Sequence, residues 1–221
     1  MIAVDEGVAR AYLQAKWVVI EEGYWSEIDW QRARSIEDLT ESAMLSEMGW
    51  VVLSSGMREA VVRDRFALVS RAFDGWTSAQ AIARQRDACI RAGIAVFGHV
   101  GKITAIAHNC QLIAEMGWPA LMHQLRTRGV DALIRLKYIG PVTKYHLAKN
   151  IGLEVAKPDR HLVRIAGALG ARSVDHLCRP LAEFSGDPVS VVDLVLWRFA
   201  TLRTDYVELM RHWRSMSFDV D

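Results

Sequence analysis

Cysteine is scarce in this sequence of 221 residues, with three residues that lie far apart and form no CxxC pair. An odd number of widely spaced cysteines is typical of buried thiols in a protein of a reducing compartment. The same scarcity excludes the four-cysteine set of an iron–sulfur cluster, and it offers no cysteine cluster for a metal ion. We therefore expect Cys89, Cys110 and Cys178 to be buried and free.

Long hydrophobic runs are also missing. No apolar stretch approaches the ~18 residues that cross a bilayer, and the first residues lack the basic and apolar segments of a secretion signal. About half of the residues are apolar (51%) and a quarter are charged (24%), which is the composition of a globular protein and not of a disordered one. We expect a soluble, intracellular protein of the cytoplasm, without a membrane partner.

Strand-like alternation, internal repeats and low-complexity segments are absent, whereas helical periodicity recurs along the chain. Ser35 is a candidate N-cap, and Gly93 is a candidate C-cap. The segment 50–73 reads as one long helix or as two helices with a break near 54–56. The chain is therefore predicted to be all-α, with helices over 8–20, 36–48, 50–73, 78–92, 102–115, 119–125, 130–136, 141–150, 160–169 and 189–204.

Charge is distributed unevenly along a chain whose net charge is only +1. Residues 1–50 carry ten acidic and four basic side chains, whereas residues 126–172 carry ten basic and three acidic ones. A local excess of positive charge in a nearly neutral protein favours a face that binds a polyanion, although many such clusters are only solvated surfaces.

The segment Leu136-Lys137-Tyr138-Ile139-Gly140-Pro141-Val142-Thr143-Lys144 joins two predicted helices through a tight turn. The N-terminus of the second helix can point free N–H groups at a phosphate without reading the base sequence. Pro141 suits the first position of that helix because its missing N–H is not needed there. Taken alone, the segment is also typical of an ordinary αα-hairpin.

A second segment, Ala156-Lys157-Pro158-Asp159-Arg160-His161-Leu162-Val163-Arg164-Ile165, places an aspartate before a predicted helix. Pro158 moves Lys157 out of the helical region, so Asp159 stands at the N-cap. Its simplest role is to cap the helix. Capping and catalysis are compatible, because the positive end of the helix and the nearby arginines would keep the carboxylate ionised.

In this order, the two segments resemble the HhH-GPD superfamily of DNA glycosylases. The family hairpin usually reads Leu-Pro-Gly-(Val/Ile)-Gly-x-x-Thr-Ala and is followed by Asp-x-His-x-x-Arg; the residues that match are Leu136, Ile139, Gly140, Thr143, Asp159, His161 and Arg164. Upstream, Val52-Leu53-Ser54-Ser55 resembles the helix end that these enzymes insert into DNA. Phe97-Gly98, Lys102 and Ile106 resemble the start of another family helix. The resemblance spans most of residues 45–170.

The resemblance implies one glycosylase unit over 1–221, made of two helical lobes with the active site in the cleft between them. The helix-hairpin-helix lies at about 130–150 and the catalytic loop and helix at 153–170, with N-terminal and C-terminal helices completing the lobes. Asp159 corresponds to the essential catalytic carboxylate of the family. The implied partner is double-stranded DNA with a modified or damaged base, bound by a nucleoid-associated monomer in base-excision repair or in defence against phage DNA.

The departures from the family pattern define the expected mechanism. Bifunctional members carry a Schiff-base lysine where this chain has Val142, so water is the expected nucleophile and Lys144 a phosphate contact or plain surface charge. The hairpin proline and first glycine are replaced by Lys137 and Tyr138, and the wedge into the duplex falls on Gly56, Met57 or Arg58. The expected DNA contacts are Lys137, Tyr138, Ile139, Gly140, Val142, Thr143 and Lys144.

Several questions stay open at this point. The chemistry needs no metal or redox cofactor, although a structural alkali ion could sit at the hairpin carbonyls. A bifunctional glycosylase/lyase with another lysine and a non-catalytic DNA-binding module are the alternatives. Neither the excised base nor the residues of its pocket follow from the sequence, because a Trp in a helical protein is more often core than pocket.

Overall fold

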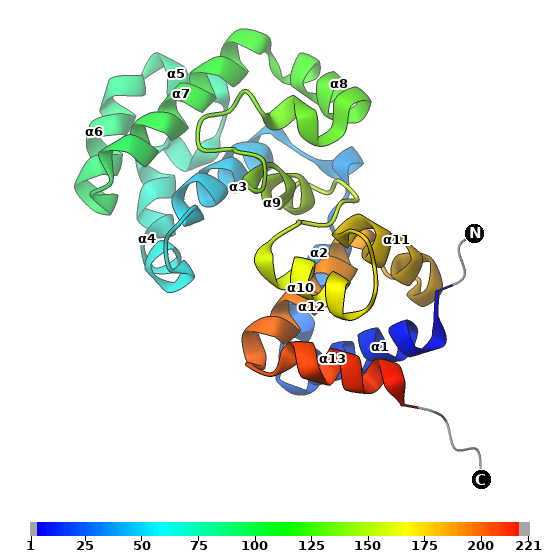
Figure 1. The fold of residues 1–221 in the computed structure, drawn as a ribbon. Coiled ribbons are helices and arrows are strands. Elements are labelled where there is room, and N and C mark those ends of the chain that lie inside the picture. Colours follow the sequence, from blue (N-terminus) through cyan, green and yellow to red (C-terminus); the bar gives the residue numbers. More distant parts are fainter. Residues whose placement is uncertain (1–3, 217–221) are drawn as a thin grey trace. The chain divides into compact units, whose positions relative to one another are not determined.

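The computed structural model describes residues 4–216, and its regular structure in this range is entirely helical (Figure 1). The predicted all-α class is therefore confirmed. The chain divides into two compact units. Unit 1 contains the described residues up to Arg34 and from Glu154 onward, and unit 2 spans Ser35–Leu153. Within the described range, no helix is long and apolar enough to cross a membrane.

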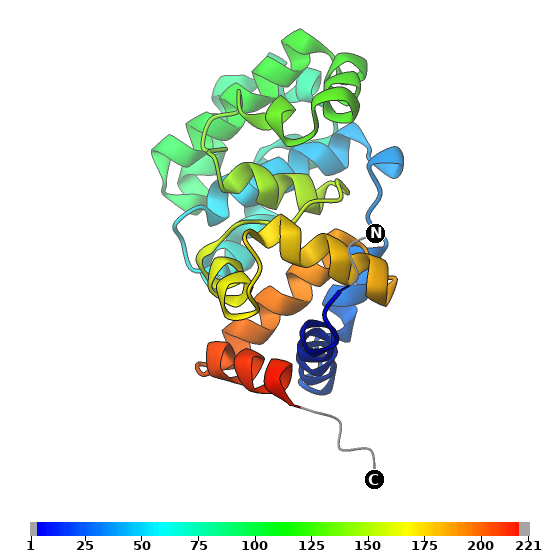
Figure 2. The ribbon, with the colours of Figure 1, turned by 45° about the vertical axis from the view of Figure 1, so that its right-hand side comes forward.

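Unit 1 is built around one hydrophobic helix, α12. This helix packs against each of the other helices of the unit. α1 and α13, which are far apart in the sequence, lie side by side (Figure 2). The helices of unit 1 are α1 (Glu6–Glu21), α2 (Trp25–Arg32), α10 (Arg160–Ala168), α11 (Val174–Ser185), α12 (Val189–Leu202) and α13 (Tyr206–Ser215).

The core of unit 1 follows from the apolar positions of α12. Val191, Val195 and Phe199 recur at helical spacing and are fully buried. They pack in one cluster with Tyr12 and Ala15 of α1, whose own apolar residues also recur every three to four positions. Burial of each large α12 side chain contributes about 1.5–3 kcal/mol to the hydrophobic stabilisation of this unit.

Unit 2 is organised around α7, which contacts α3, α5, α6 and α8. Its buried residues include Ile103, Ile106 and Ile113, which face these neighbours. The elements of unit 2 are the 3-10 turn η1 (Ile36–Asp38), α3 (Glu41–Ser54), α4 (Glu59–Ala72), η2 (Asp74–Trp76), α5 (Ala79–Arg84), α6 (Arg86–Phe97), α7 (Val100–Met116), α8 (Trp118–Arg128), η3 (Gly129–Leu133) and α9 (Thr143–Asn150).

Several predicted helix limits are wrong, for local reasons. The helix expected over 36–48 is a 3-10 turn followed by α3, because Leu39 is extended. Ser35 caps only the turn, and Thr40 caps α3 by accepting the N–H of Ala43 at 3.1 Å. The segment 50–73 contains the end of α3 and the whole of α4, so the break expected near 54–56 is confirmed, whereas a helix start at residue 50 is wrong.

The expected stop at Gly93 is also wrong. Gly93 lies inside α6, and the helix ends at Gly98, which has a left-handed conformation. A Cβ at position 93 would lie 2.9 Å from Ile103 and 3.1 Å from Phe73. The absence of a side chain at this position therefore permits close helix packing, not termination. The first half of the predicted hairpin, 130–136, is the 3-10 turn η3, and α9 begins at Thr143 instead of Pro141.

Three helices were not predicted: α2, α11 and α13. α2 is eight residues long and mostly polar, so its hydrophobic pattern is weak. α11 contains Pro180, which normally indicates a break in a helix. α13 lies at the end of the described chain and buries only Tyr206 and Met210.

Candidate functional site

The hairpin of unit 2 is a tight turn between η3 and α9. The N–H of Ile139 donates to the carbonyl of Leu136 (3.2 Å), and the N–H of Lys144 donates to the carbonyl of Gly140 (3.0 Å). Thr143 folds its hydroxyl back to accept the N–H of Gly140 at 2.6 Å. Among the described residues, nothing accepts the N–H groups of Val142 and Thr143. The first turn of α9 therefore offers two unbonded donors, as a phosphate site requires.

Tyr138 occupies the hairpin position at which the family has a glycine. Its φ of 64° lies in the left-handed region, which glycine adopts far more readily than tyrosine. The Tyr138 ring lies across the start of α7: a Cβ on Gly101 would be 2.8 Å from its hydroxyl, and the Lys102 ammonium is 5.9 Å from the ring centroid. Tyr138 is nevertheless 44% exposed, so part of this residue is accessible to solvent.

A buried amide holds the other end of the turn. Asn109 of α7 is fully buried, and its Oδ1 accepts the N–H of Lys137 at 2.8 Å while its Nδ2 donates to the carbonyl of Lys137 at 3.1 Å. One side chain thus satisfies both backbone groups of a hairpin residue. Asn109 belongs to no sequence motif, and its one signal in the sequence is that a polar residue stands on the apolar face of a predicted helix.

The side chains of the hairpin differ in their availability. The Lys137 and Val142 side chains are exposed, whereas Ile139 is buried and can offer a ligand only its backbone. Lys144 is engaged by Asp131, with its Nζ 2.7 Å from a carboxylate oxygen. The hydrogen bond between them raises the pKa of Lys144 and lowers the pKa of Asp131. Lys144 therefore stays protonated, while the negative charge of Asp131 offsets part of its positive charge.

The upstream segments of the resemblance meet at the end of α3. The Lys102 ammonium is buried and donates to the carbonyls of Val52 (2.9 Å) and Leu53 (2.6 Å), and it also contacts the carbonyl of Ser55. These carbonyls are the free acceptors at the helix C-terminus, where a cation is stabilised by the helix dipole. Burial lowers the pKa of Lys102. Unit 2 thus brings the end of α3, the start of α7 and Tyr138 of the hairpin together.

The expected wedge residues form the connection from α3 to α4. Gly56 has a left-handed φ of 69°, and Met57 closes the turn by donating its N–H to the carbonyl of Ser54 at 3.1 Å. Arg58 is exposed and stands at the N-cap of α4 without a side-chain capping bond. The connection begins at the end of α3, which the Lys102 ammonium fixes. Within it, Met57 is partly buried and Arg58 is exposed.

Asp159 lies in unit 1 and caps α10, as the simplest interpretation expected. Its Oδ1 accepts the N–H groups of His161 (2.9 Å) and Leu162 (3.1 Å). No group in residues 4–216 donates a hydrogen bond to its Oδ2, and the Lys157 ammonium is 3.9 Å from that oxygen. The Asp159 side chain is 14% exposed. It is a partly shielded carboxylate with one oxygen fixed and the other available.

The surroundings of Asp159 carry positive charge but keep His161 neutral. Arg160 and Arg164 are on the first turns of α10, next to Lys157 in the preceding loop. Burial is the largest cause of a lowered pKa at His161, and the nearby cations lower it further against the opposing effect of Asp159. A His161 nitrogen lies 3.3 Å from the Tyr206 hydroxyl. His161 therefore supports the helix as a neutral, packed side chain.

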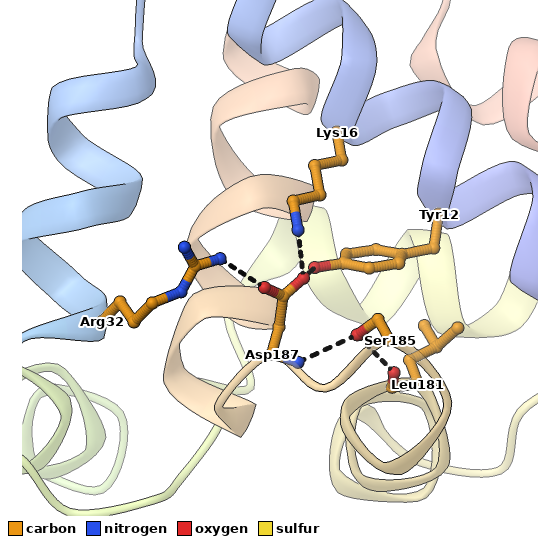
Figure 3. Close-up of polar contacts among 6 residues, drawn as sticks. All are labelled: Tyr12, Lys16, Arg32, Leu181, Ser185 and Asp187. Carbon is orange, nitrogen blue, oxygen red and sulfur yellow. Dashed lines mark hydrogen bonds and ion pairs between the residues drawn. The ribbon is translucent and has the colours of Figure 1, made fainter.

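Asp187 is the strongest polar centre of unit 1, and the sequence analysis did not identify it. Its carboxylate accepts the Tyr12 hydroxyl (2.6 Å) and pairs with Lys16 (2.6 Å) and Arg32 (2.7 Å), and all three side chains point toward it (Figure 3). Burial alone would raise the pKa of Asp187, but these hydrogen bonds lower it below its usual value. The cluster ties α1 and α2 to the loop before α12.

Aromatic side chains are divided between core and surface. Trp76 is buried, and its Nε1 donates to the hydroxyl of Ser70 at 2.9 Å. In contrast, Trp17 of α1 and Trp25 and Trp30 of α2 are exposed. All three cysteines are buried and free, as expected. Among the described residues, no group of three or more His, Cys, Asp or Glu could hold a metal ion.

Comparisons with protein-family models, with curated proteins and with solved structures each found no match for this chain.

Proposed function

We propose that this chain is a monofunctional DNA glycosylase, which flips a modified or damaged base out of double-stranded DNA and hydrolyses its N-glycosidic bond. We also propose that the helices include a helix-hairpin-helix motif and that the active site lies in a cleft between two lobes. This part of the proposal rests on the sequence resemblance alone. The biological setting is base-excision repair or defence against phage DNA with modified bases, in the cytoplasm, with the protein acting as a monomer.

The observation that carries the proposal is the geometry of Asp159. Its Oδ1 is fixed by two N–H groups of α10, while its Oδ2 accepts no hydrogen bond from the described residues. A carboxylate that is anchored through one oxygen can present the other to a reacting group without reorganisation. The Lys157 ammonium, 3.9 Å from Oδ2, and the arginines of α10 place positive charge around this carboxylate.

Glycosidic hydrolysis uses such a carboxylate in two ways. As the bond between the base nitrogen and the sugar carbon C1′ breaks, the electron pair leaves with the base and positive charge builds on the deoxyribose. The Asp159 carboxylate stabilises that charge and accepts a proton from the water whose oxygen bonds to C1′. The departing base is protonated by solvent, and the product is an abasic site in an intact strand.

The hairpin supports the DNA-binding part of the proposal. The unbonded N–H groups of Val142 and Thr143 and the exposed Lys137 can bind phosphate oxygens regardless of sequence. Tyr138 adds a partly exposed aromatic residue that can lie along a sugar. Val142 stands where bifunctional members of the family carry their nucleophilic lysine, and its side chain has no amine to form an imine.

One observation favours a second function, that of a bifunctional glycosylase/lyase. The Lys157 amine is 3.9 Å from Asp159 Oδ2, in the same loop as the proposed catalytic carboxylate. An amine at this distance could attack C1′ and displace the base, provided that it first loses a proton. We favour the monofunctional reaction because Val142, which has no amine, stands at the position of the nucleophilic lysine in the pattern of the bifunctional enzymes.

Base release and borohydride trapping together test the proposal. The protein is incubated with genomic DNA and with phage DNAs that contain modified bases, and free bases are identified by mass spectrometry. We expect a released base, an abasic strand that breaks only in alkali, and no covalent adduct after borohydride treatment. Trapping that is lost in Lys157→Met would establish the bifunctional reaction instead. DNA binding without release of any base would favour a non-catalytic binding module.

A further inference from the structure

Asp193 is a buried carboxylate that contacts the backbone next to the proposed catalytic residue. It lies on α12 and is 1% exposed. Its Oδ2 accepts the N–H of Lys157 at 2.6 Å, two residues before Asp159. This bond joins a buried side chain of α12 to the backbone of the loop that leads to Asp159. Its placement suggests a role in the geometry of the loop.

The loop leads from this contact directly to Asp159. The N–H of Asp159 donates to the carbonyl of Lys157 at 2.8 Å, which closes a three-residue turn around Pro158. The proline ring restricts φ within that turn. Lys157 therefore has its N–H fixed by Asp193 and its carbonyl fixed by Asp159, so its peptide groups connect α12 to the catalytic position.

A second contact fixes the start of the same loop. The Glu154 carboxylate accepts the N–H and the hydroxyl of Ser190 at 3.5 and 3.4 Å, and Ser190 lies one turn before Asp193 on α12. The residues between Glu154 and α10 form no helix or strand, so these side-chain contacts replace a backbone ladder. The Asp193 bond is the shorter one and lies closer to Asp159.

We propose that Asp193 is a positioning residue, which holds the Lys157-Pro158-Asp159 turn so that Asp159 Oδ2 is presented to the reacting sugar. This inference rests on the proposed glycosylase function. Asp193 acts through the peptide of Lys157 and does not touch the substrate. The requirement is an acceptor oxygen at the end of a short side chain, so asparagine should replace aspartate, whereas alanine should not.

The test compares Asp193→Ala, Asp193→Asn and a control, Asp187→Ala. The control removes another buried carboxylate of unit 1 that anchors α1 and α2 and makes no bond to the Asp159 loop. Single-turnover base release and DNA affinity are measured at a temperature at which each variant is folded. We expect Asp193→Ala to slow base release on the order of 100-fold with DNA affinity little changed, because small displacements of a catalytic group have large effects on the rate. Asp193→Asn should restore most of the rate, and the control should release base normally.

Normal base release by Asp193→Ala, or an equal loss in the Asp187→Ala control, would overturn the proposal. Hydrogen exchange of the Lys157, Asp159 and His161 amides gives a readout that does not depend on activity. Exchange at these amides should accelerate in Asp193→Ala only. If the unaltered protein releases no base, the proposed function fails, whereas the exchange data still show whether Asp193 holds the turn. Unchanged exchange in Asp193→Ala would remove the positioning role in either case.

Discussion

Asp187 shows how one side chain can organise several elements. Three groups from α1 and α2 converge on its carboxylate, and its own N–H donates to the hydroxyl of Ser185 at 3.3 Å, which in turn donates to the carbonyl of Leu181 (Figure 3). The carboxylate is 3% exposed, whereas Lys16 and Arg32 are 19% and 38% exposed. The cations therefore keep part of their hydration while they compensate a buried anion, which is a favourable arrangement for an ion cluster.

The first prediction concerns the pH dependence of this cluster. Folding lowers the pKa of Asp187, so the unfolded chain binds more protons at acidic pH and the free energy of unfolding falls as pH drops below about 4. Asp187→Asn should cost about 2–4 kcal/mol at pH 7. The difference between the variant and the unaltered protein should shrink between about pH 4 and pH 2.

Urea unfolding at a series of pH values measures this difference. Asp175→Asn is the control, since Asp175 forms an exposed pair with Arg179 on α11 and should change stability little. A difference for Asp187→Asn that stays constant from pH 7 to pH 2 would show that the carboxylate charge is not what stabilises the cluster.

The second prediction concerns Asn109. Asn109→Leu removes the partners of both backbone groups of Lys137, and two unsatisfied polar groups cost about 2–4 kcal/mol together. Because the hairpin turn is no longer held, DNA affinity should fall as well. Gln111→Leu on the same helix is the control, since Gln111 bonds only the exposed Glu115. Stability and DNA affinity equal to those of the control would show that the two hydrogen bonds between Asn109 and Lys137 contribute little to either property.

At the scale of elements, the two lysines of the hairpin turn differ: Lys144 pairs with Asp131, whereas Lys137 forms no ion pair with any residue in 4–216. Lys137→Ala should weaken binding to all DNA sequences alike and lower the salt dependence by about one unit of log–log slope. Lys144→Ala should have a smaller effect, because Lys144 gives up its ion pair with Asp131 when it binds a phosphate. Asp131→Asn should therefore tighten DNA binding.

Fluorescence anisotropy with DNA duplexes of several sequences and at several salt concentrations measures these effects. Glu59→Gln on α4 is a control for Asp131→Asn, since it breaks an exposed ion pair with Arg63 outside the hairpin. A loss of affinity for one sequence only, with an unchanged salt slope, would contradict backbone binding by the hairpin.

The elements also show which parts of a helical fold can be read from a sequence. Long amphipathic helices such as α1, α7 and α12 were predicted within a few residues, because their apolar positions repeat over three turns or more. Gly93 was misread as a terminator because the sequence does not show whether a glycine faces a neighbouring helix or ends its own. Helix α11 was not predicted because it contains Pro180, and a proline usually interrupts a helix. The sequence does not show that tertiary packing stabilises this helix with the proline inside it.

At the scale of the whole molecule, motif residues were predictable, but the residues that hold them were not. Asp159 was placed at a helix N-cap from the Pro-Asp pair, and the structure has it there. Asn109, Asp187 and Asp193 had no motif, because each is defined by a backbone or side-chain partner that is distant in sequence. The chain returns to unit 1 at Glu154, so unit 1 is assembled from both ends of the sequence. No local sequence pattern predicted this arrangement.

The central claim is that Asp159 is catalytic and does not only cap α10. Asp159→Asn keeps an N-cap acceptor of nearly the same shape, so the protein should fold normally. Asp5→Asn is the matched control: Asp5 caps α1 in the same unit by accepting the N–H of Val8 at 3.0 Å. If Asp159 were only a cap, the two variants should behave alike.

The decisive measurement is single-turnover base release by the unaltered protein, Asp159→Asn and Asp5→Asn, with DNA affinity measured in parallel. The account predicts that Asp159→Asn lowers the rate by at least about 100-fold, equivalent to about 2.7 kcal/mol or more in the barrier, while DNA affinity stays within a few-fold. Asp5→Asn should release base at the normal rate. Base release by Asp159→Asn at the rate of the control would contradict the catalytic assignment.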